Sequence, residues 1–118
     1  MKVQDIDELL GAPARLAIIA TAAAGGRWTF TELRQETGLA DGNLHVQTRK
    51  LTTAGYLARE REKQGNRMVT CFELTERGRQ AFENHLRRLS RALAGDGRFA
   101  RGDLSGKTGP GRDKSQVW

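Results

Sequence analysis

The short distance between two helix signals around Gly38 constrains the fold most strongly. Thr29 and Glu32 have the spacing of a capping box, in which each side chain accepts a hydrogen bond from a free backbone N–H at the start of a helix. This helix is predicted to run to about Thr37 and to end at Gly38, which can adopt the left-handed conformation of a C-cap. Asp41 follows only three residues later and is predicted to be the N-cap of the next helix. Two short helices joined by so tight a turn form a helix-turn-helix motif.

Helical patterns also precede this motif. Apolar residues at the spacing i, i+3, i+4 predict a short first helix that contains Ile6, Leu9 and Leu10. Pro13 suits the first turn of a second helix, where its missing N–H costs nothing, and Gly25 follows as a stop signal. The apolar stripe of this second helix is predicted to consist of Leu16, Ile19, Ala20 and Ala23.

After Gly55 the period of the apolar residues changes from about 3.6 to 2. Residues 56–62 are strand-like, residues 63–66 have turn composition, and a second strand is predicted from the alternation of Met68, Thr70, Phe72 and Leu74. Thr75 is expected to cap a final helix. The predicted fold class is mainly α with a small β-hairpin (α+β), a winged helix-turn-helix with a C-terminal dimerisation helix.

The chain divides into two regions by composition. Its 118 residues suffice for one domain, and residues 1–94 are predicted to form a winged helix-turn-helix domain with terminal dimerisation helices. Residues 95–118 contain 6 of the 14 glycines and carry a net charge of +2. This composition predicts a disordered, glycine-rich, basic tail. The net charge of the whole chain, +6, suggests an acidic partner.

Several classes of protein are not expected. The longest apolar run has nine residues, whereas a membrane-spanning helix needs roughly 20. The acidic N-terminus does not resemble a secretion signal, and Cys71, the only cysteine, allows no disulfide framework. No arrangement of nucleophile and base, phosphate-binding loop or metal-ligand cluster is evident. We therefore expect a soluble, cytoplasmic protein without membrane association, metal, cofactor or enzymatic activity.

The helix that begins at Asp41 is predicted to present a polar face suited to the DNA major groove. Leu44, Thr48 and Leu51 define its inward face, and the outward face centres on Val46 and Arg49. Amide side chains can pair with adenine, arginine with guanine, and a valine methyl can contact thymine, while a lysine suits a phosphate. The candidate DNA-binding residues of this helix are Asn43, His45, Val46, Gln47, Arg49 and Lys50.

The predicted hairpin supplies a second candidate DNA contact. Residues 41–67 carry a net charge of +3, half of the net charge of the chain. Glu60 and Glu62 would repel phosphate, so we expect Arg59 and Arg61 beside them to contribute less than the tip. The tip residues, whose arginine can enter a narrow minor groove, are Lys63, Gln64, Asn66 and Arg67.

The last helix carries an apolar stripe that either completes the domain or meets a twofold-related copy. We favour dimerisation, because the additional burial would stabilise a small domain and because a palindrome is bound by two DNA-binding domains, one on each half-site. His85, beside this stripe, is expected to be a structural histidine at that interface, and Cys71 a small buried hydrophobe. The residues predicted to form the interface are Leu9, Phe82, Leu86, Leu89 and Leu93.

Two motifs together resemble those of the small MarR-like winged-helix transcriptional regulators. They are Ala-Gly-Tyr at residues 54–56 and Leu-Thr-Glu-x-Gly at residues 74–78, and the resemblance extends over residues 9–93. It implies a dimer that binds palindromic operator DNA, with the third helix in the major groove and the hairpin near the minor groove. Thr48 stands where such helices usually have leucine, and its hydroxyl is expected to bond to the carbonyl four residues earlier.

These observations predict a sequence-specific DNA-binding transcriptional regulator, expected to repress by occupying its operator as a homodimer. The alternative is a winged helix that serves as a protein–protein interaction module without specific DNA readout. The polar and basic outward face of the third helix favours double-stranded DNA as the partner. The sequence leaves the identity of a small-molecule effector open.

Overall fold

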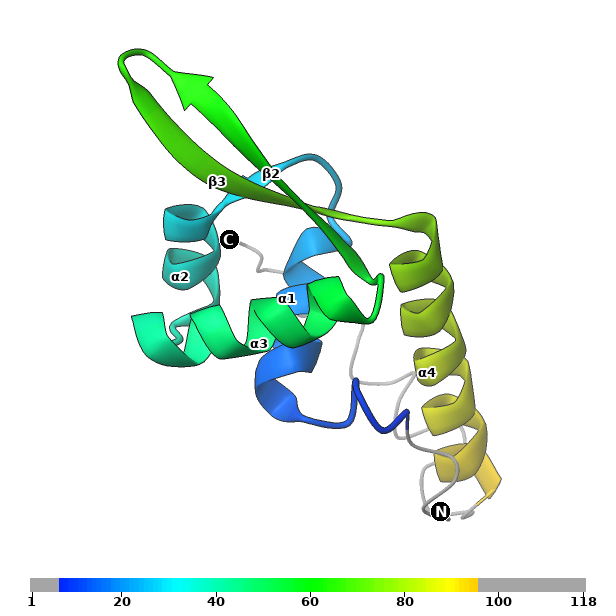
Figure 1. Cartoon of the computed structure of the whole chain (residues 1–118). Helices are drawn as coiled ribbons and strands as arrows, with labels where there is room; N and C mark the ends of the chain where they lie inside the picture. The colour runs from blue at the N-terminus through cyan, green and yellow to red at the C-terminus, as the bar shows by residue number, and fades with distance from the viewer. Residues whose placement is uncertain (1–6, 96–118) are drawn as a thin grey trace, which may run out of the picture.

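The computed structural model describes residues 7–95 and confirms the predicted winged helix-turn-helix (Figure 1). Three helices form the body, a long hairpin projects from it, and the last helix stands beside the base of the hairpin. Residues 96–118 of the predicted tail, and Ile6, lie outside the described residues. The elements are α1 (Pro13–Ala22), β1 (Trp28–Thr29), α2 (Phe30–Thr37), α3 (Asp41–Thr53), β2 (Leu57–Gln64), β3 (Arg67–Leu74) and α4 (Glu76–Gly95).

The helix-turn-helix consists of α2 and α3. The capping box is present, since the Glu32 N–H donates to Thr29 Oγ1 at 3.1 Å and the Thr29 N–H donates to Glu32 Oε1 at 2.9 Å. Gly38 is left-handed, with φ 74°. The prediction that Asp41 caps α3 is wrong: the N-cap is Ala40, and Asp41 is the first helical residue. Its carboxylate pairs with Arg34 at 3.0 Å instead, which connects α3 to α2 across the turn.

Of the predicted first helix, the residues that the structure describes form a turn. The Asp7 side chain accepts hydrogen bonds from the N–H groups of Leu9 at 2.8 Å and Leu10 at 2.9 Å, and the Gly11 N–H donates to the Asp7 carbonyl at 2.7 Å. Local bonds of an aspartate compete with helix formation, and Pro13 starts α1 directly afterwards. Leu10 is nevertheless fully buried in the core.

The buried stripe of α1 differs in part from the predicted one. Ile19 is buried as expected, but Ala20 is exposed, and Ile18 and Ala22 are buried in its place. Burial of a large isoleucine removes more apolar surface from water than burial of an alanine, so the helix is rotated toward Ile18. The core consists of Leu10, Ile18, Ile19, Ala22, Leu33, Leu44, Leu51, Leu57 and Phe72.

The sheet has a third strand that the sequence did not predict. Its order is β1-β3-β2, and Trp28 of β1 pairs with Phe72 of β3. Two residues are too few to show a period-two pattern, which explains why β1 was missed. The hairpin turn is tighter than predicted, because Gln64 pairs with Arg67 and leaves Gly65, with φ 64°, and one further residue in the loop.

The last helix begins as predicted, with Thr75 Oγ1 accepting a hydrogen bond from the Gly78 N–H at 2.9 Å. His85 is structural, but it is 2% exposed within the chain itself and is not left for an interface. Its Nδ1 accepts a hydrogen bond from the Asp7 N–H at 3.3 Å, which joins α4 to the N-terminal turn. Within residues 7–95, no helix has the length and apolarity needed to span a membrane.

Candidate nucleic-acid interface

Helix α3 buries one face and exposes the other, as the sequence predicted. Leu44, Thr48 and Leu51 are buried. The Thr48 hydroxyl donates to the Leu44 carbonyl at 2.8 Å, so its buried oxygen is satisfied in the expected way. Five of the six candidate DNA-binding side chains are exposed, and only Gln47 is half-buried; the exposed five are Asn43, His45, Val46, Arg49 and Lys50.

A groove runs between α3 and the hairpin. His45 and Arg49 line it from α3, and Arg59, Arg67 and Met68 line it from the two strands. The His45 ring also stacks on the ring of Phe30 at the start of α2, with 4.3 Å between the centroids. Basic side chains from both elements therefore border one concave surface, and the stacking holds His45 of α3 at the edge of this groove.

Strand β2 separates its charges between the two faces of the hairpin. Arg59 and Arg61 alternate with Glu60 and Glu62, and successive side chains of a strand point to opposite faces. The two arginines share the face of buried Leu57, toward the body, and the two glutamates lie on the reverse face. The glutamates therefore do not stand beside the arginines on one face, and they give no reason to expect a small contribution of Arg59 and Arg61 to DNA binding.

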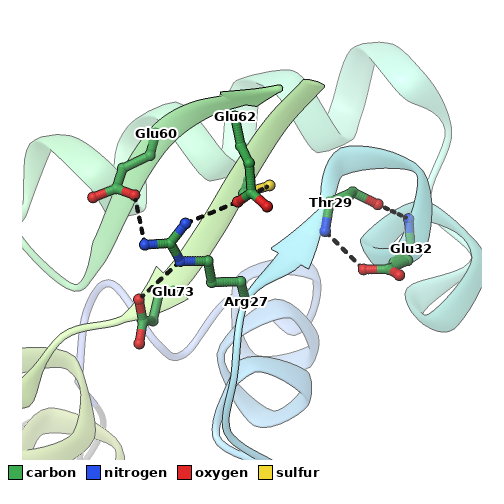
Figure 2. A network of polar contacts seen from close by, with 7 residues as sticks. Arg27, Thr29, Glu32, Glu60, Glu62 and Glu73 are labelled. Carbon is green, nitrogen blue, oxygen red and sulfur yellow. Dashed lines mark hydrogen bonds and ion pairs between the residues drawn. The ribbon is translucent and has the colours of Figure 1, made fainter. Parts of the chain in front are cut away.

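The reverse face of the hairpin carries an ion-pair cluster that the sequence did not predict (Figure 2). Arg27, in the loop before β1, contacts Glu60 at 3.1 Å, Glu62 at 2.8 Å and Glu73 at 3.8 Å. The hydrogen bond to Glu62 and the charges of the glutamates raise the pKa of Arg27, and the same hydrogen bond lowers the pKa of Glu62. This cluster, here called the Arg27 clamp, joins both strands of the hairpin to the segment that leads into α2.

Cys71 is buried beneath the Arg27 clamp, on the face of β3 opposite to Phe72. Its thiol donates a weak hydrogen bond to Glu62 Oε1 at 3.5 Å. Burial, and secondly the bond to Glu62, raise the pKa of the Cys71 thiol, which disfavours the reactive thiolate. Among the described residues, no three histidine, cysteine or carboxylate side chains are grouped to hold a metal ion.

The flank of α3 away from the hairpin contains a second unpredicted contact. Arg15 of α1 donates from Nη1 to Gln47 Oε1 at 2.7 Å, and Gln47 Nε2 donates to Asn43 Oδ1 at 2.9 Å. Arg15 Nε also donates to the Leu9 carbonyl at 2.7 Å. Two of the candidate base-reading amides are thus held by each other and by the body of the domain. No local spacing signals a contact between residues 32 positions apart.

The remaining candidate residues lie where the strand and helix patterns placed them. Lys63, Gln64, Asn66 and Arg67 are all exposed at the hairpin tip. In the set predicted for dimerisation, Leu9 and Phe82 pack against the core of their own chain. Leu86 is 47% exposed, and Leu89 and Leu93 are half-buried.

The fold and this surface define a winged-helix domain with a basic, donor-rich face of the kind that binds duplex DNA. The family model described as "Winged helix DNA-binding domain" matches residues 14–93, and the chain belongs to this family. The chain also shares its fold with solved structures of transcriptional regulators, MarR among them.

Three comparisons illustrate the relationship. The transcriptional regulator homologue from Pyrococcus horikoshii OT3 is 25% identical, with a TM-score of 0.70 over 75% of this chain and 88% of that one. A mutant MarR from E. coli shares the fold, at 19% identity and a TM-score of 0.64 over 75% of this chain and 68% of that one. Protein MJ0432 of Methanocaldococcus jannaschii is 32% identical over 57 residues, which are 48% of this chain and only 62% of that protein.

Proposed function

We propose that this protein is a DNA-binding transcriptional regulator that reads a palindromic operator as a homodimer and represses transcription by occupying it. The observation that carries the proposal is the groove between α3 and the hairpin, where Arg49 and Arg59 face the same space from two elements. A helix fits the major groove, and its exposed donors can then reach base edges while the hairpin follows the neighbouring backbone.

The exposed face of α3 supports sequence-specific readout. Arg49 can donate two hydrogen bonds to guanine, and Val46, 44% exposed, offers methyl groups to thymine. Lys50 suits a phosphate, which positions the helix without reading sequence. At the hairpin tip, exposed Arg67 and Lys63 are suited to the minor groove and its phosphates.

The apolar side of α4 supports the homodimer. Leu86 is 47% exposed, and Leu89 and Leu93 continue along the same side of the helix. A second copy that packs there would remove these leucines from water and would set two α3 helices on two half-sites. Sedimentation of Leu86→Asp should show a monomer, whereas Asn84→Asp, which places the same charge on the opposite exposed side of α4, should remain dimeric. A monomeric wild type would refute this part of the proposal.

Selection from a randomised duplex library at two salt concentrations tests the DNA readout. The wild type should enrich a palindrome, and Arg49→Ala should lose or broaden the base preference at one position in each half-site. Arg87→Ala serves as the control, because it removes the same charge from an exposed site on α4. Binding without sequence preference would contradict specific readout, and no binding at low salt would favour the protein-interaction alternative.

The selected operator then allows a test of repression. Placed across a promoter in a transcription reaction with purified polymerase, it should make transcript yield fall as the protein is added. A yield that rises would assign activation instead.

A further inference from the structure

The contact between Arg15 and Gln47 fixes which way the Gln47 amide is turned. A guanidinium has five N–H donors and no acceptor. The Gln47 atom that lies 2.7 Å from Arg15 Nη1 must therefore be the amide oxygen. Because Arg15 Nε is also bonded to the Leu9 carbonyl, the guanidinium itself is held in place from two sides.

The same logic determines the orientation of Asn43. With its oxygen on Arg15, Gln47 turns Nε2 along the helix, and this nitrogen donates to Asn43 at 2.9 Å. The Asn43 atom that receives this bond must be Oδ1. Since the oxygen and nitrogen of a planar amide point in different directions, Nδ2 of exposed Asn43 is directed away from Gln47.

We infer that Asn43 is a specificity-determining residue that reads hydrogen-bond acceptors on DNA, and that Arg15 and Gln47 are the positioning residues that impose this polarity. The inference rests on the proposed binding of DNA by α3. Bidentate pairing of asparagine with adenine needs the amide oxygen and nitrogen together. Here the oxygen is turned toward Gln47, so Nδ2 is the atom directed to DNA, and the base at this position should offer an acceptor: O6 or N7 of guanine, O4 of thymine or N7 of adenine.

Replacement of Gln47 by glutamate tests this inference because it should reverse the polarity. In Gln47→Glu, one carboxylate oxygen still accepts from Arg15, but the other can only accept from Asn43. The Asn43 amide should then turn over, with Nδ2 on residue 47 and Oδ1 toward DNA. The preferred base should change to one with an amino donor, adenine or cytosine.

The experiment compares selection from a randomised duplex library by the wild type and four variants. Asn43→Ala identifies the position that Asn43 reads, as the one whose preference is lost. At that position the wild type should disfavour cytosine, whose major-groove edge has no acceptor, by about tenfold, and Gln47→Glu should instead disfavour guanine and thymine, whose edges have no donor. Asn43→Asp, which presents only oxygen, should prefer adenine or cytosine as well. Gln35→Glu, the same substitution at an exposed site of α2, controls for the added negative charge and should keep the wild-type preference.

The outcomes separate this inference from the proposed function. A wild type that enriches no sequence overturns both. A palindrome with an unchanged preference in Gln47→Glu, or with cytosine preferred by the wild type at the Asn43 position, overturns the inference alone. Circular dichroism and thermal unfolding of each variant establish that the compared proteins are folded.

Discussion

Substitution of Gly78 by alanine should destabilise the domain, although alanine is the better helix former. Gly78 lies buried in the first turn of α4. A Cβ added there would lie 2.3 Å from the carbonyl oxygen of Tyr56 and 2.8 Å from Leu74 Cδ1, whereas non-bonded heavy atoms ordinarily approach to about 3.5 Å. The Leu74 side chain can move, but the Tyr56 carbonyl is fixed because it accepts a hydrogen bond from the Thr75 N–H at 3.1 Å.

The expected size of the effect follows from three opposing contributions. Replacing glycine by alanine inside a helix gains about 1 kcal/mol. Overpacking costs about 1–3 kcal/mol, and displacing the half-buried Thr75–Tyr56 hydrogen bond adds about 1 kcal/mol. The net loss should be about 2 kcal/mol, which for a domain of this size lowers the Tm by about 8–16 °C.

Gly42 provides the matched control for this experiment. It also lies in the first turn of a helix, α3, but a Cβ added there meets nothing within 4 Å. Gly42→Ala should therefore raise stability by up to about 1 kcal/mol. Urea unfolding followed by circular dichroism measures both variants against the wild type. If Gly78→Ala were as stable as the wild type, the close approach of α4 to Tyr56 would not be a constraint on the fold.

Four further predictions concern the hairpin and α3. Arg27→Ala should weaken DNA binding, measured by fluorescence anisotropy, because three glutamates then stand uncompensated on the hairpin; unchanged affinity would show that the Arg27 clamp does not matter for binding. Because the folded pKa of Glu62 is lowered, the clamp should be present at neutral pH and lost as pH falls through that pKa, and NMR titration should find the Glu62 pKa higher in Arg27→Ala. Cys71 should react with a thiol reagent much more slowly in buffer than in urea, since burial raises its pKa and covers it; equal rates would contradict the burial. Thr48→Val should change the free energy of unfolding by less than about 1 kcal/mol in urea melts, because the partners of the hydroxyl within residues 7–95 are helix carbonyls alone. A larger loss would mean that the hydroxyl has another role.

Local signals predicted the parts of the fold that neighbouring residues determine. The capping box at Thr29, the left-handed Gly38 and the cap at Thr75 each depend on residues no more than a few positions apart, and all three are present. The outward face of α3 was predicted for the same reason, since helix geometry alone separates it from Leu44 and Leu51.

Contacts between residues of different elements explain several features that the sequence did not predict. Asp41 has a side chain suited to an N-cap, but it lies one position further on, as the first residue of α3. There its carboxylate forms an ion pair with Arg34 of the preceding helix. The Arg27 clamp joins residues 33–46 positions apart, and Arg15 reaches Gln47 over 32 positions. Neither arginine belongs to a motif, so only the packed fold brings it to its partners.

The placement of the charges of β2 is indicated by the sequence pattern itself. Residues 59–62 read Arg-Glu-Arg-Glu, and in a strand this alternation must place the arginines on one face and the glutamates on the other. If residues 56–62 form a strand, the glutamates lie on the other face and do not offset the positive charge of the arginines. What the sequence did not reveal is the residue that compensates the acidic face. Arg27 takes that role, and it leaves the opposite, basic face of the hairpin to the groove beside α3.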